Sequence, residues 1–396
     1  MPQPTVHIRE LTPDDLPAAW TLRQHAFGID PQPPPPATTM PPGATRHGAF
    51  DTAGQLLGQA VDLHHHQWWN GRPVTAADVA GVAVAPAARG RGVARALLTA
   101  LLRGAHDRGA AVSALFPTTT APYRACGWDV AGALRTLDIT TTALPRHRPA
   151  PHLTIRDGHP TDLPAVTDLY EHVTRHRRGL LTRRGPQHVH PTDTLPTDGL
   201  TLVEHDHQLV GYATWNRGRG YGTDAVLTVD DIHATTADAA RALIGSLASW
   251  ASVAPTLRLH LLDGDAVTAH LPVETAREQH RDTWMHRPVD VTRAIAQRGW
   301  PTHTRGTTTF TLHDDLADWN TGTWRLDIAD GTAELTPTHT DTPLHLTVRG
   351  FAQLYTGASN AETLHHAGLL HTDANTDPRP LDLLAAAGPA HLHDYF

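Results

Sequence analysis

The chain has 396 residues, of which 40% are hydrophobic, with a formal net charge of −8 and a single cysteine. This length exceeds what one common core supports, so we expect two or three domains. The negative charge argues against nucleic acid as a partner, and one cysteine excludes an internal disulfide and fits the reducing cytoplasm. No apolar run is long enough to span a membrane, and the first residues lack the regions of a secretory signal.

The composition is biased in a way that weakens one obvious signal. The chain contains no lysine and has 30 histidines, which we attribute to genomic base composition. His64, His65 and His66 are adjacent, and adjacent side chains of a strand point to opposite faces of the sheet. They therefore do not converge on one ion, and we expect no metal cofactor.

The first 84 residues predict a helix, a loop and an antiparallel meander. A strand is expected over Thr5–Arg9, and Thr12 has the features of a cap that starts a helix. Asp30–Gly43 is rich in proline and predicts an irregular loop. Strands are expected over 49–50 and 55–62. Asn70-Gly71 is a hairpin signal, which joins a strand ending near Trp69 to the strand that runs through Val79 to Val84.

The stretch that follows carries the strongest functional signal. The apolar strand ends before Pro86, which has no N–H to donate. A loop of arginines and glycines leads into a helix with leucines at helical spacing. The unpaired N–H groups and the dipole at such a helix start favour a pyrophosphate, and Gly90 and Gly92 let it approach the main chain.

The spacing of this loop separates it from other phosphate-binding loops. A P-loop needs a lysine, and a dinucleotide-binding turn needs a third glycine where Arg95 stands. Arg89-x-x-Gly92-x-Ala94 after V-x-V-x-P resembles the acetyl-CoA-binding signature of the GNAT N-acetyltransferases. The alternative is an ordinary Arg/Gly surface turn, but strand, proline, arginine, glycine and apolar helix all follow in the required order.

A second buried strand follows the helix, which we expect to end at Gly109. The strand is expected over Ala111–Phe116, and a hydroxyl-rich turn and a short helix with Tyr123 come after it. On spacing alone, Tyr123 fits a core or surface position as well as a site. Cys126 has no charged base beside it in the sequence, so we expect a small buried thiol.

The middle of the chain repeats the order of its opening. Arg146–Pro151 has the composition of a linker, and Leu153–Arg156 then matches the first strand. Strands over 200–204, 209–215, 225–233 and 257–262 and a helix over 238–250 follow in the order of the first domain. Residues 232–236 have no proline, no arginine and no Gly-x-Gly, so this copy is expected not to bind CoA.

The pattern changes from Met285 on. A helix over Val289–Arg298 is expected to end at Gly299. Short strands are expected over 307–312, 322–328, 333–336 and 344–348, and short helices over 349–354, 361–367 and 381–387. This pattern predicts a small α+β domain.

Taken together, the chain resembles the Eis (enhanced intracellular survival) family of aminoglycoside and amine N-acetyltransferases over its whole length. The resemblance rests on V-x-V-x-P-x-x-R-x-R-G, the order of the domains, Tyr123 after the threonine-rich turn and the terminal Phe396. It implies a mixed α/β fold with two tandem GNAT-type domains, a catalytic one over 1–148 and a degenerate one over 152–285. A sterol-carrier-protein-like domain over 286–396 follows, whose C-terminal carboxylate enters the active site. The resemblance also implies a homo-hexamer.

The resemblance implies acetyl-CoA as co-substrate and assigns residues to it. The expected contacts are Val82, Ala83 and Val84 for the acetyl and pantetheine arm, Gly90, Arg91, Gly92, Val93, Ala94 and Arg95 for the pyrophosphate, and Thr118 and Thr119 at the gap between the two strands. Tyr123 would be the general acid and the α-carboxylate of Phe396 the general base. A tyrosine with a pKa of ~10 can protonate a thiolate whose acid has a pKa of ~8.5. A terminal carboxylate with a pKa of ~3.5 is a poor base in water, unless it is desolvated, acts through water or orients a cationic amine.

The chain departs from the family pattern in two places. Gly90 stands where family members often carry another arginine, which implies one weaker charge contact with the phosphates. The Asp30–Gly43 segment differs from the family in the acceptor region, which leaves the substrate range open. Asp30 and Asp394 are candidates for binding a polycationic acceptor, or are solvated surface carboxylates. Three functions fit the sequence: N-acetylation of small polyamines such as aminoglycosides, acetylation of protein lysines or peptide amines, and a non-catalytic acyl-CoA- or lipid-binding module.

Overall fold

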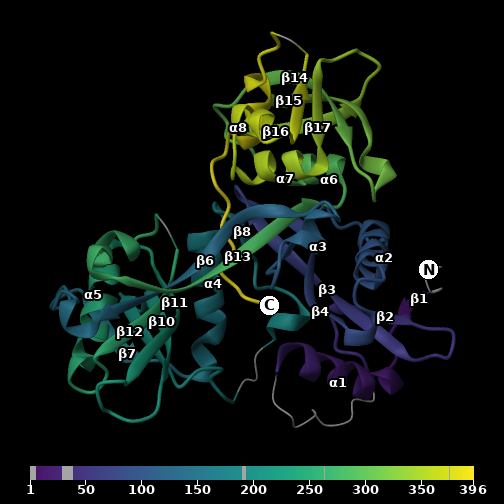
Figure 1. The fold of residues 1–396 in the computed structure, drawn as a ribbon. Helices are drawn as coiled ribbons and strands as arrows, with labels where there is room; N and C mark the ends of the chain where they lie inside the picture. Colours follow the sequence, from purple (N-terminus) through teal and green to yellow (C-terminus); the bar gives the residue numbers. More distant parts are fainter. Residues whose placement is uncertain (1–5, 29–38, 190–192, 263, 374) are drawn as a thin grey trace. The chain divides into compact units, whose positions relative to one another are not determined.

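The computed structural model describes residues 6–28, 39–189, 193–262, 264–373 and 375–396 (Figure 1). The chain divides into two compact units. Unit 1 contains Met1–Gly132, Arg177–Gln187 and Thr283–Phe396, and unit 2 contains Ala133–His176 and His188–Asp282. None of the helices in the described part of the chain combines the length and the apolar character that crossing a bilayer requires.

The larger sheet of unit 1 is antiparallel except for one pair of strands. Its strands are β1 (His7–Glu10), β2 (Ala44–Phe50), β3 (Leu56–Trp69), β4 (Arg72–Val84), β5 (Val112–Leu115) and the end of β13 (Arg277–Pro288), in that order, with β8 (Arg178–Leu181) paired to β3. Only β4 and β5 pair in parallel. The helices are α1 (Leu16–Phe27), α2 (Val93–Asp107) and α3 (Ala121–Arg124).

Several expected elements of this sheet are confirmed. Asn70 and Gly71 adopt φ of 49° and 87° and join β3 to β4 in the predicted hairpin. Helix α2 buries a stripe of leucines and ends before Gly109, whose φ is 89°. Strand β3 is much longer than expected, because it pairs with both β2 and β4 while its polar residues interrupt the apolar pattern. Pairing with the neighbouring strands, rather than the alternation of polar and apolar residues, determines the length of β3.

Unit 2 repeats the opening of unit 1. Its sheet has the strand order β6 (Asp129–Thr140), β12 (Thr256–Leu261), β11 (Val226–Ala234), β10 (Gln208–Arg217), β9 (Gly199–His205) and β7 (Leu153–Asp157), with helices α4 (Leu163–Thr174) and α5 (Ala237–Ala248). Arg156 donates two hydrogen bonds to Asp162, as Arg9 does to Asp15 in the first copy. The same ion pair therefore joins strand and helix start in both copies.

The two units differ from the linear boundaries expected from the sequence. Residues 133–148 belong to unit 2, although we placed them with the first domain, and residues 177–187 belong to unit 1, although we placed them with the second. The reason for the second difference is that β8 pairs with β3. Pairing between segments distant in the sequence leaves no local pattern.

The C-terminal part of unit 1 is a separate α+β layer. Its sheet has the order β16 (Thr332–Pro337), β15 (Gly322–Ala329), β14 (Gly306–His313), β17 (Leu344–Thr347) and β18 (Leu370–Thr372), with helices α6 (Val291–Gln297), α7 (Val348–Thr356) and α8 (Ala361–His366). The expected helix over 381–387 is wrong, since Arg379–Ala385 forms a 3₁₀ helix.

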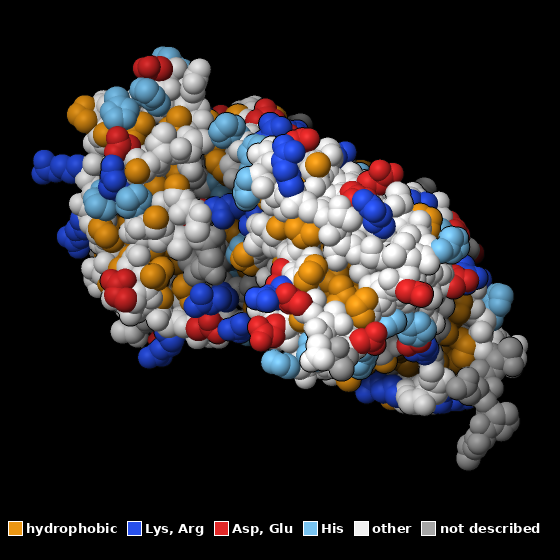
Figure 2. Space-filling view, turned by 90° about the horizontal axis from the view of Figure 1, so that it is seen from above, with side chains coloured by type: hydrophobic (Ala, Val, Ile, Leu, Met, Phe, Trp, Pro, Cys, Tyr) orange, Lys and Arg blue, Asp and Glu red, His pale blue; other side chains and the backbone are white. Residues whose placement is uncertain are grey.

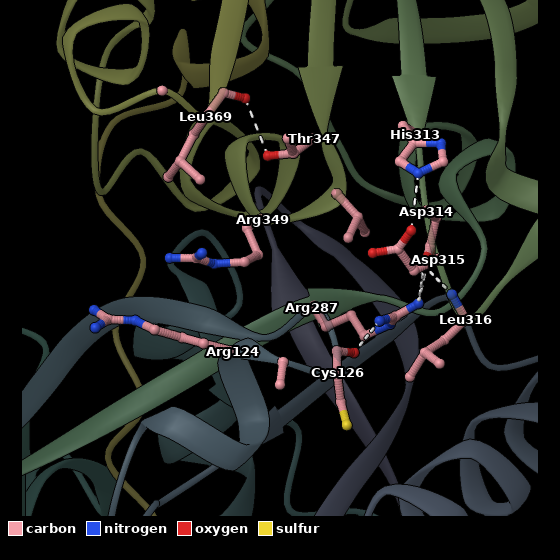
Figure 3. A pocket seen from close by; sticks show the side chains of 14 residues that line it. Arg124, Cys126, Arg287, His313, Asp314, Asp315, Leu316, Thr347, Arg349 and Leu369 are labelled. Atoms are coloured by element: carbon pink, nitrogen blue, oxygen red, sulfur yellow. Dashed lines mark hydrogen bonds and ion pairs between the residues drawn. The ribbon is translucent and has the colours of Figure 1, made fainter.

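Two ion-pair clusters join this layer to the turn after α3, and Figure 3 shows the one between Arg287 and Asp314. Arg287 and Asp314 are 0% and 1% exposed and lie 2.6 Å apart, and Arg287 also donates to the carbonyl oxygen of Cys126. Arg349 and Arg124 both donate to the buried carboxylate of Asp129, at 2.8 and 3.1 Å. Breaking a buried pair costs about 3–5 kcal/mol, so these contacts hold the C-terminal layer firmly to the first domain.

Gly127→Ala is expected to loosen this attachment. A Cβ at Gly127 collides with the guanidinium of Arg287, whereas Gly109 has a similar positive φ and no atom within 4 Å of its Cβ position. We expect Gly109→Ala to lower the free energy of unfolding by about 1 kcal/mol and Gly127→Ala by about 3 kcal/mol or more. Denaturant unfolding of both variants measures this, and equal losses would show that the Arg287 contact contributes nothing.

Candidate active site

The site begins where β4 and β5 stop pairing. Their parallel register runs from Ala76 opposite Val112 to Val79 opposite Leu115, and β4 continues to Val84. On its other edge β4 carries a bulge, because the register with β3 shifts between Gln59 and Val61. Gly81 lies in this bulge with φ of 56°, a conformation that glycine adopts without strain. A bulge bends its strand, and here it accompanies the separation of β4 from β5.

A cavity of about 430 Å³ lies along the free end of β4. It brings together seven residues that we assigned to the site from the sequence: Val82, Ala83, Val84, Ala94, Thr118, Thr119 and Tyr123. Its lining also includes Ala26 and Phe27 at the end of α1. No sequence signal pointed to these two, because they follow a helical pattern that fits a core face equally well.

A second cavity of about 320 Å³ lies at the start of α2. It is lined by Gly90, Gly92, Val93, Ala94 and Arg95 of the expected pyrophosphate loop, together with Val84, Ala88 and Arg89. Gly90 and Gly92 adopt φ of 73° and 79°, and no atom lies within 4 Å of a Cβ at either. Gly92 caps α2 without a side-chain hydrogen bond, so the helix start is open to an anion.

Two residues of the loop differ from the expectation. Arg91 lines neither of these two cavities and donates to the carbonyl oxygen of Ala87 at 3.5 Å. Arg89 lines both, although we did not assign it to the cofactor. The sequence signal for Arg89 was present, because Arg89 is the first arginine of the motif V-x-V-x-P-x-x-R-x-R-G.

The C-terminal tail, residues 390–396, reaches the end of β5. Its amide groups at Ala390 and His391 donate at 2.8 Å to carbonyl oxygens of α7 and β8, and in Figure 1 it runs from the C-terminal layer past β8. The ring of Phe396 lies edge-on to Phe116, with centroids 5.6 Å apart. Phe116 directly follows β5 and comes two residues before Thr118. The tail therefore ends beside the turn that lines the larger cavity.

The segment Arg177–Gln187 holds the tail, and sequence reasoning missed it. Arg183 donates to one carboxylate oxygen of Asp394 at 2.8 Å, and the other oxygen is buried without a hydrogen-bond partner. Gly179 lets the tail pass, because a Cβ there lies 2.5 Å from the carbonyl oxygen of His391. The other acidic candidate, Asp30, lies outside the described residues.

Burial sets the chemistry of Tyr123 and Cys126. Burial, with a smaller effect of Cys126, raises the pKa of Tyr123 to about 12. The thiol of Cys126 is buried and its pKa is raised, which confirms the expected small buried thiol. Tyr123 is therefore a neutral hydroxyl at physiological pH and can donate a proton.

Among the residues that the structure describes, no group of three His, Cys, Asp or Glu could hold a metal ion. On the face shown in Figure 2, histidines and side chains of both charges are interspersed rather than gathered in one patch.

Comparisons with known proteins agree with this architecture. Residues 7–131 and 183–291 each match a family described as an acetyltransferase (GNAT) domain, and residues 291–392 match the sterol carrier protein domain. N-acetyltransferase Eis of Mycobacterium tuberculosis is 29% identical over 411 aligned residues that cover 97% of each chain. A GCN5-related N-acetyltransferase from Kribbella flavida is similar over 100% of this chain and 99% of its own, with 27% identity and a TM-score of 0.83. One from Anabaena variabilis shares the fold over 99% of this chain and 100% of its own, with 23% identity and a TM-score of 0.85.

The chain is a GNAT-type acetyltransferase. The predicted fold, two tandem GNAT domains followed by a sterol-carrier-protein-like domain, is confirmed. GNAT acetyltransferases use acetyl-CoA. The two cavities of this acetyltransferase fit that donor, because apolar strand residues line one and an uncapped helix start with two glycines lines the other.

We expect Gly92→Ala to weaken binding of acetyl-CoA by tenfold or more, a loss of about 1.4 kcal/mol, because a Cβ fills the approach to the helix start. Gly54→Ala is the matched control, since Gly54 has φ of 80°, open space around its Cβ position and a place in a distant hairpin turn. Isothermal titration calorimetry measures both. Equal affinities of the two variants for acetyl-CoA would contradict a role of the glycine loop in binding.

We expect Tyr123 to stay protonated where other tyrosines ionise. Tyr123→Phe should therefore leave the phenolate absorbance unchanged up to about pH 11, because the ordinary pKa of tyrosine is about 10. Tyr221→Phe, which removes a phenol that is 84% exposed, is the matched control. A Tyr123 signal that titrates with the others would contradict the effect of burial.

Proposed function

We propose that this acetyltransferase belongs to the Eis family and transfers acetyl groups from acetyl-CoA to amines of small polycationic acceptors such as aminoglycosides, directly within a ternary complex. One observation carries the proposal. The tail of the sterol-carrier-protein-like domain ends against Phe116, beside the cavity lined by Tyr123. A domain that served only to carry a lipid would not need its last residue there.

We assign the donor to the two cavities. Val82, Ala83 and Val84 hold the acetyl and pantetheine arm, with Thr118 and Thr119 at its side. The loop Gly90–Arg95 holds the pyrophosphate, to which we now add Arg89. The uncapped start of α2 supports this assignment, since its N–H groups and dipole favour an anion.

We assign the general acid and the general base to residues beside the larger cavity. Tyr123 keeps its proton because of burial and delivers it to the departing thiolate of CoA. The α-carboxylate of Phe396 receives or orients the acceptor ammonium, since a terminal carboxylate in water is a weak base with a pKa of ~3.5. No enzyme nucleophile is needed, in line with the buried, neutral thiol of Cys126.

The acidic tail supports a cationic acceptor. Asp394 uses one carboxylate oxygen to accept from Arg183, and its negative charge on the tail favours a cationic acceptor over a neutral or anionic one. A lysine side chain of a protein or peptide carries the same ammonium, so protein acetylation remains the second candidate. The homo-hexamer and the cytoplasmic location, which the resemblance and the composition suggest, belong to this proposal.

The proposal predicts that moving the terminal carboxylate abolishes activity. A chain extended by one glycine keeps the Phe396 ring but displaces the carboxylate, and Phe396→Ala keeps the carboxylate but loses the ring. We expect the extension, like deletion of Phe396, to lower kcat/KM by about 10²-fold or more, the usual contribution of acid–base groups.

Thiol release from acetyl-CoA with an aminoglycoside and with a lysine peptide measures this. Full activity of the extended chain would agree with the transferase function but would contradict the role of the Phe396 carboxylate as a base. Activity with the lysine peptide alone would favour protein acetylation. An absence of release with either acceptor would favour the acyl-CoA- or lipid-binding module.

A further inference from the structure

We propose that His65, held as a doubly protonated imidazolium between Asp78 and Gln187, is a positioning residue that keeps the C-terminal tail docked and so fixes the carboxylate of Phe396. The role of that carboxylate rests on the proposed function. The docking itself does not, because it can be measured without activity.

The hydrogen bonds around His65 determine its protonation. Gln187 donates its amide NH₂ group to the carbonyl oxygen of Gly43, so its Oε1 is turned toward Nε2 of His65, 2.7 Å away. Nδ1 of His65 lies 3.0 Å from Asp78. An amide oxygen and a carboxylate can only accept, so both ring nitrogens must carry a proton.

The surroundings of His65 stabilise this charge. The side chain is 5% exposed, and burial by itself lowers the pKa. The hydrogen bond and charge of Asp78, the hydrogen bond of Gln187 and the charge of Asp394 outweigh burial and raise the pKa above its ordinary value. Asp78 is itself fixed, since it accepts from the backbone N–H of Ala114 at 2.9 Å.

Other titrating groups face this cluster from the same strand and from α2. Burial lowers the pKa of both His64 and His66, with Arg108 and His65 adding to the effect, so these two histidines are neutral. Burial raises the pKa of Asp62 to about 6, against the charge of Arg108. Asp62 therefore contributes to any change in tail docking near pH 6. The effect of His65 is measured at pH values above this range.

The tail contacts this imidazolium directly. The rings of Phe396 and His65 have centroids 5.5 Å apart, and the negative charge of Asp394 favours the imidazolium. Coupling of this kind is reciprocal, so the charge on His65 stabilises the docked tail as much as the tail stabilises the charge. Gln187 ends the segment that holds the tail through Arg183.

Loss of one proton undoes this arrangement. A neutral imidazole has one N–H, so either Asp78 or Gln187 loses its donor, and the attraction to Asp394 disappears. As pH rises through the raised pKa of His65, the docked tail becomes less stable. His65 is a base whose pKa is raised in the folded state. Its protonation therefore stabilises the docked tail below this pKa, and the stabilisation is lost above it.

Carboxypeptidase release of Phe396 tests the docking. The release rate from the full chain is divided, at each pH, by the rate from a synthetic peptide of residues 388–396. We expect protection that declines as pH rises above the ordinary histidine pKa of about 6.5. His65→Gln should remove about tenfold of protection at low pH and abolish its pH dependence, whereas the control His66→Gln should behave as the unmodified chain does.

Kinetics test the consequence for the reaction. The ratio of kcat/KM between the unmodified chain and His65→Gln cancels the titration of the acceptor amine. We expect this ratio to be about tenfold at neutral pH and to fall toward one at alkaline pH. In a chain without Phe396, His65→Gln should cause no further loss, because it acts through the tail.

Asp394→Asn keeps the bond from Arg183 and tests the proposal if His65→Gln does not fold. We expect it to move the midpoint of protection to lower pH, because one charge that favours the imidazolium is gone. Protection that is independent of pH, an unchanged midpoint, or equal losses with and without Phe396 would overturn the proposal. Protection as expected without thiol release would instead reject the proposed function and leave the positioning role standing.

Discussion

The separation of β4 from β5 is the feature on which the site depends. Parallel pairing of the two strands ends at Val79 and Leu115, although β4 runs on to Val84. If the pairing continued, the peptide groups of the last residues of β4 would bond to β5 and the cavity beside them would close. The bulge with Gly81 at positive φ bends β4 at this point. A local backbone irregularity thus opens the space that an acetyl donor requires.

The two GNAT-type copies share a strand arrangement but differ at the start of one helix. In unit 2, β11 pairs in parallel with β12 up to Val229 and then continues to Ala234, as β4 does in unit 1. The difference lies at the next helix. Thr236 caps α5 and accepts from the N–H of Ala239, whereas Gly92 leaves the start of α2 uncapped. A helix start in which a capping side chain already accepts from one N–H group has fewer free donors for a phosphate.

The last residues of the sterol-carrier-protein-like domain lie beside the turn that lines the larger cavity. Buried ion pairs at Arg287 and Asp129 fasten it to the turn after α3, and the segment Arg177–Gln187 guides the tail onward. The Arg287–Asp314 pair is fully buried, so it is costly to break and specific in direction. The same logic applies to His65, whose charge is maintained by partners from the sheet, the segment and the tail.

Local sequence was enough to predict the glycine loop and the open helix start that line the second cavity. Proline, arginine and glycine in Pro86–Arg95 act through backbone conformation and helix-start N–H groups, which are properties of neighbouring residues. For the same reason the Asn70-Gly71 hairpin and a second copy without a glycine-rich loop could be predicted. Tertiary structure alone decided that β8 joins unit 1, that Arg287 reaches Asp314, and that His65 meets Asp78, Gln187 and Phe396. These contacts join residues far apart in the chain, and burial and charge pairing act through space, so no local pattern in the sequence encodes them.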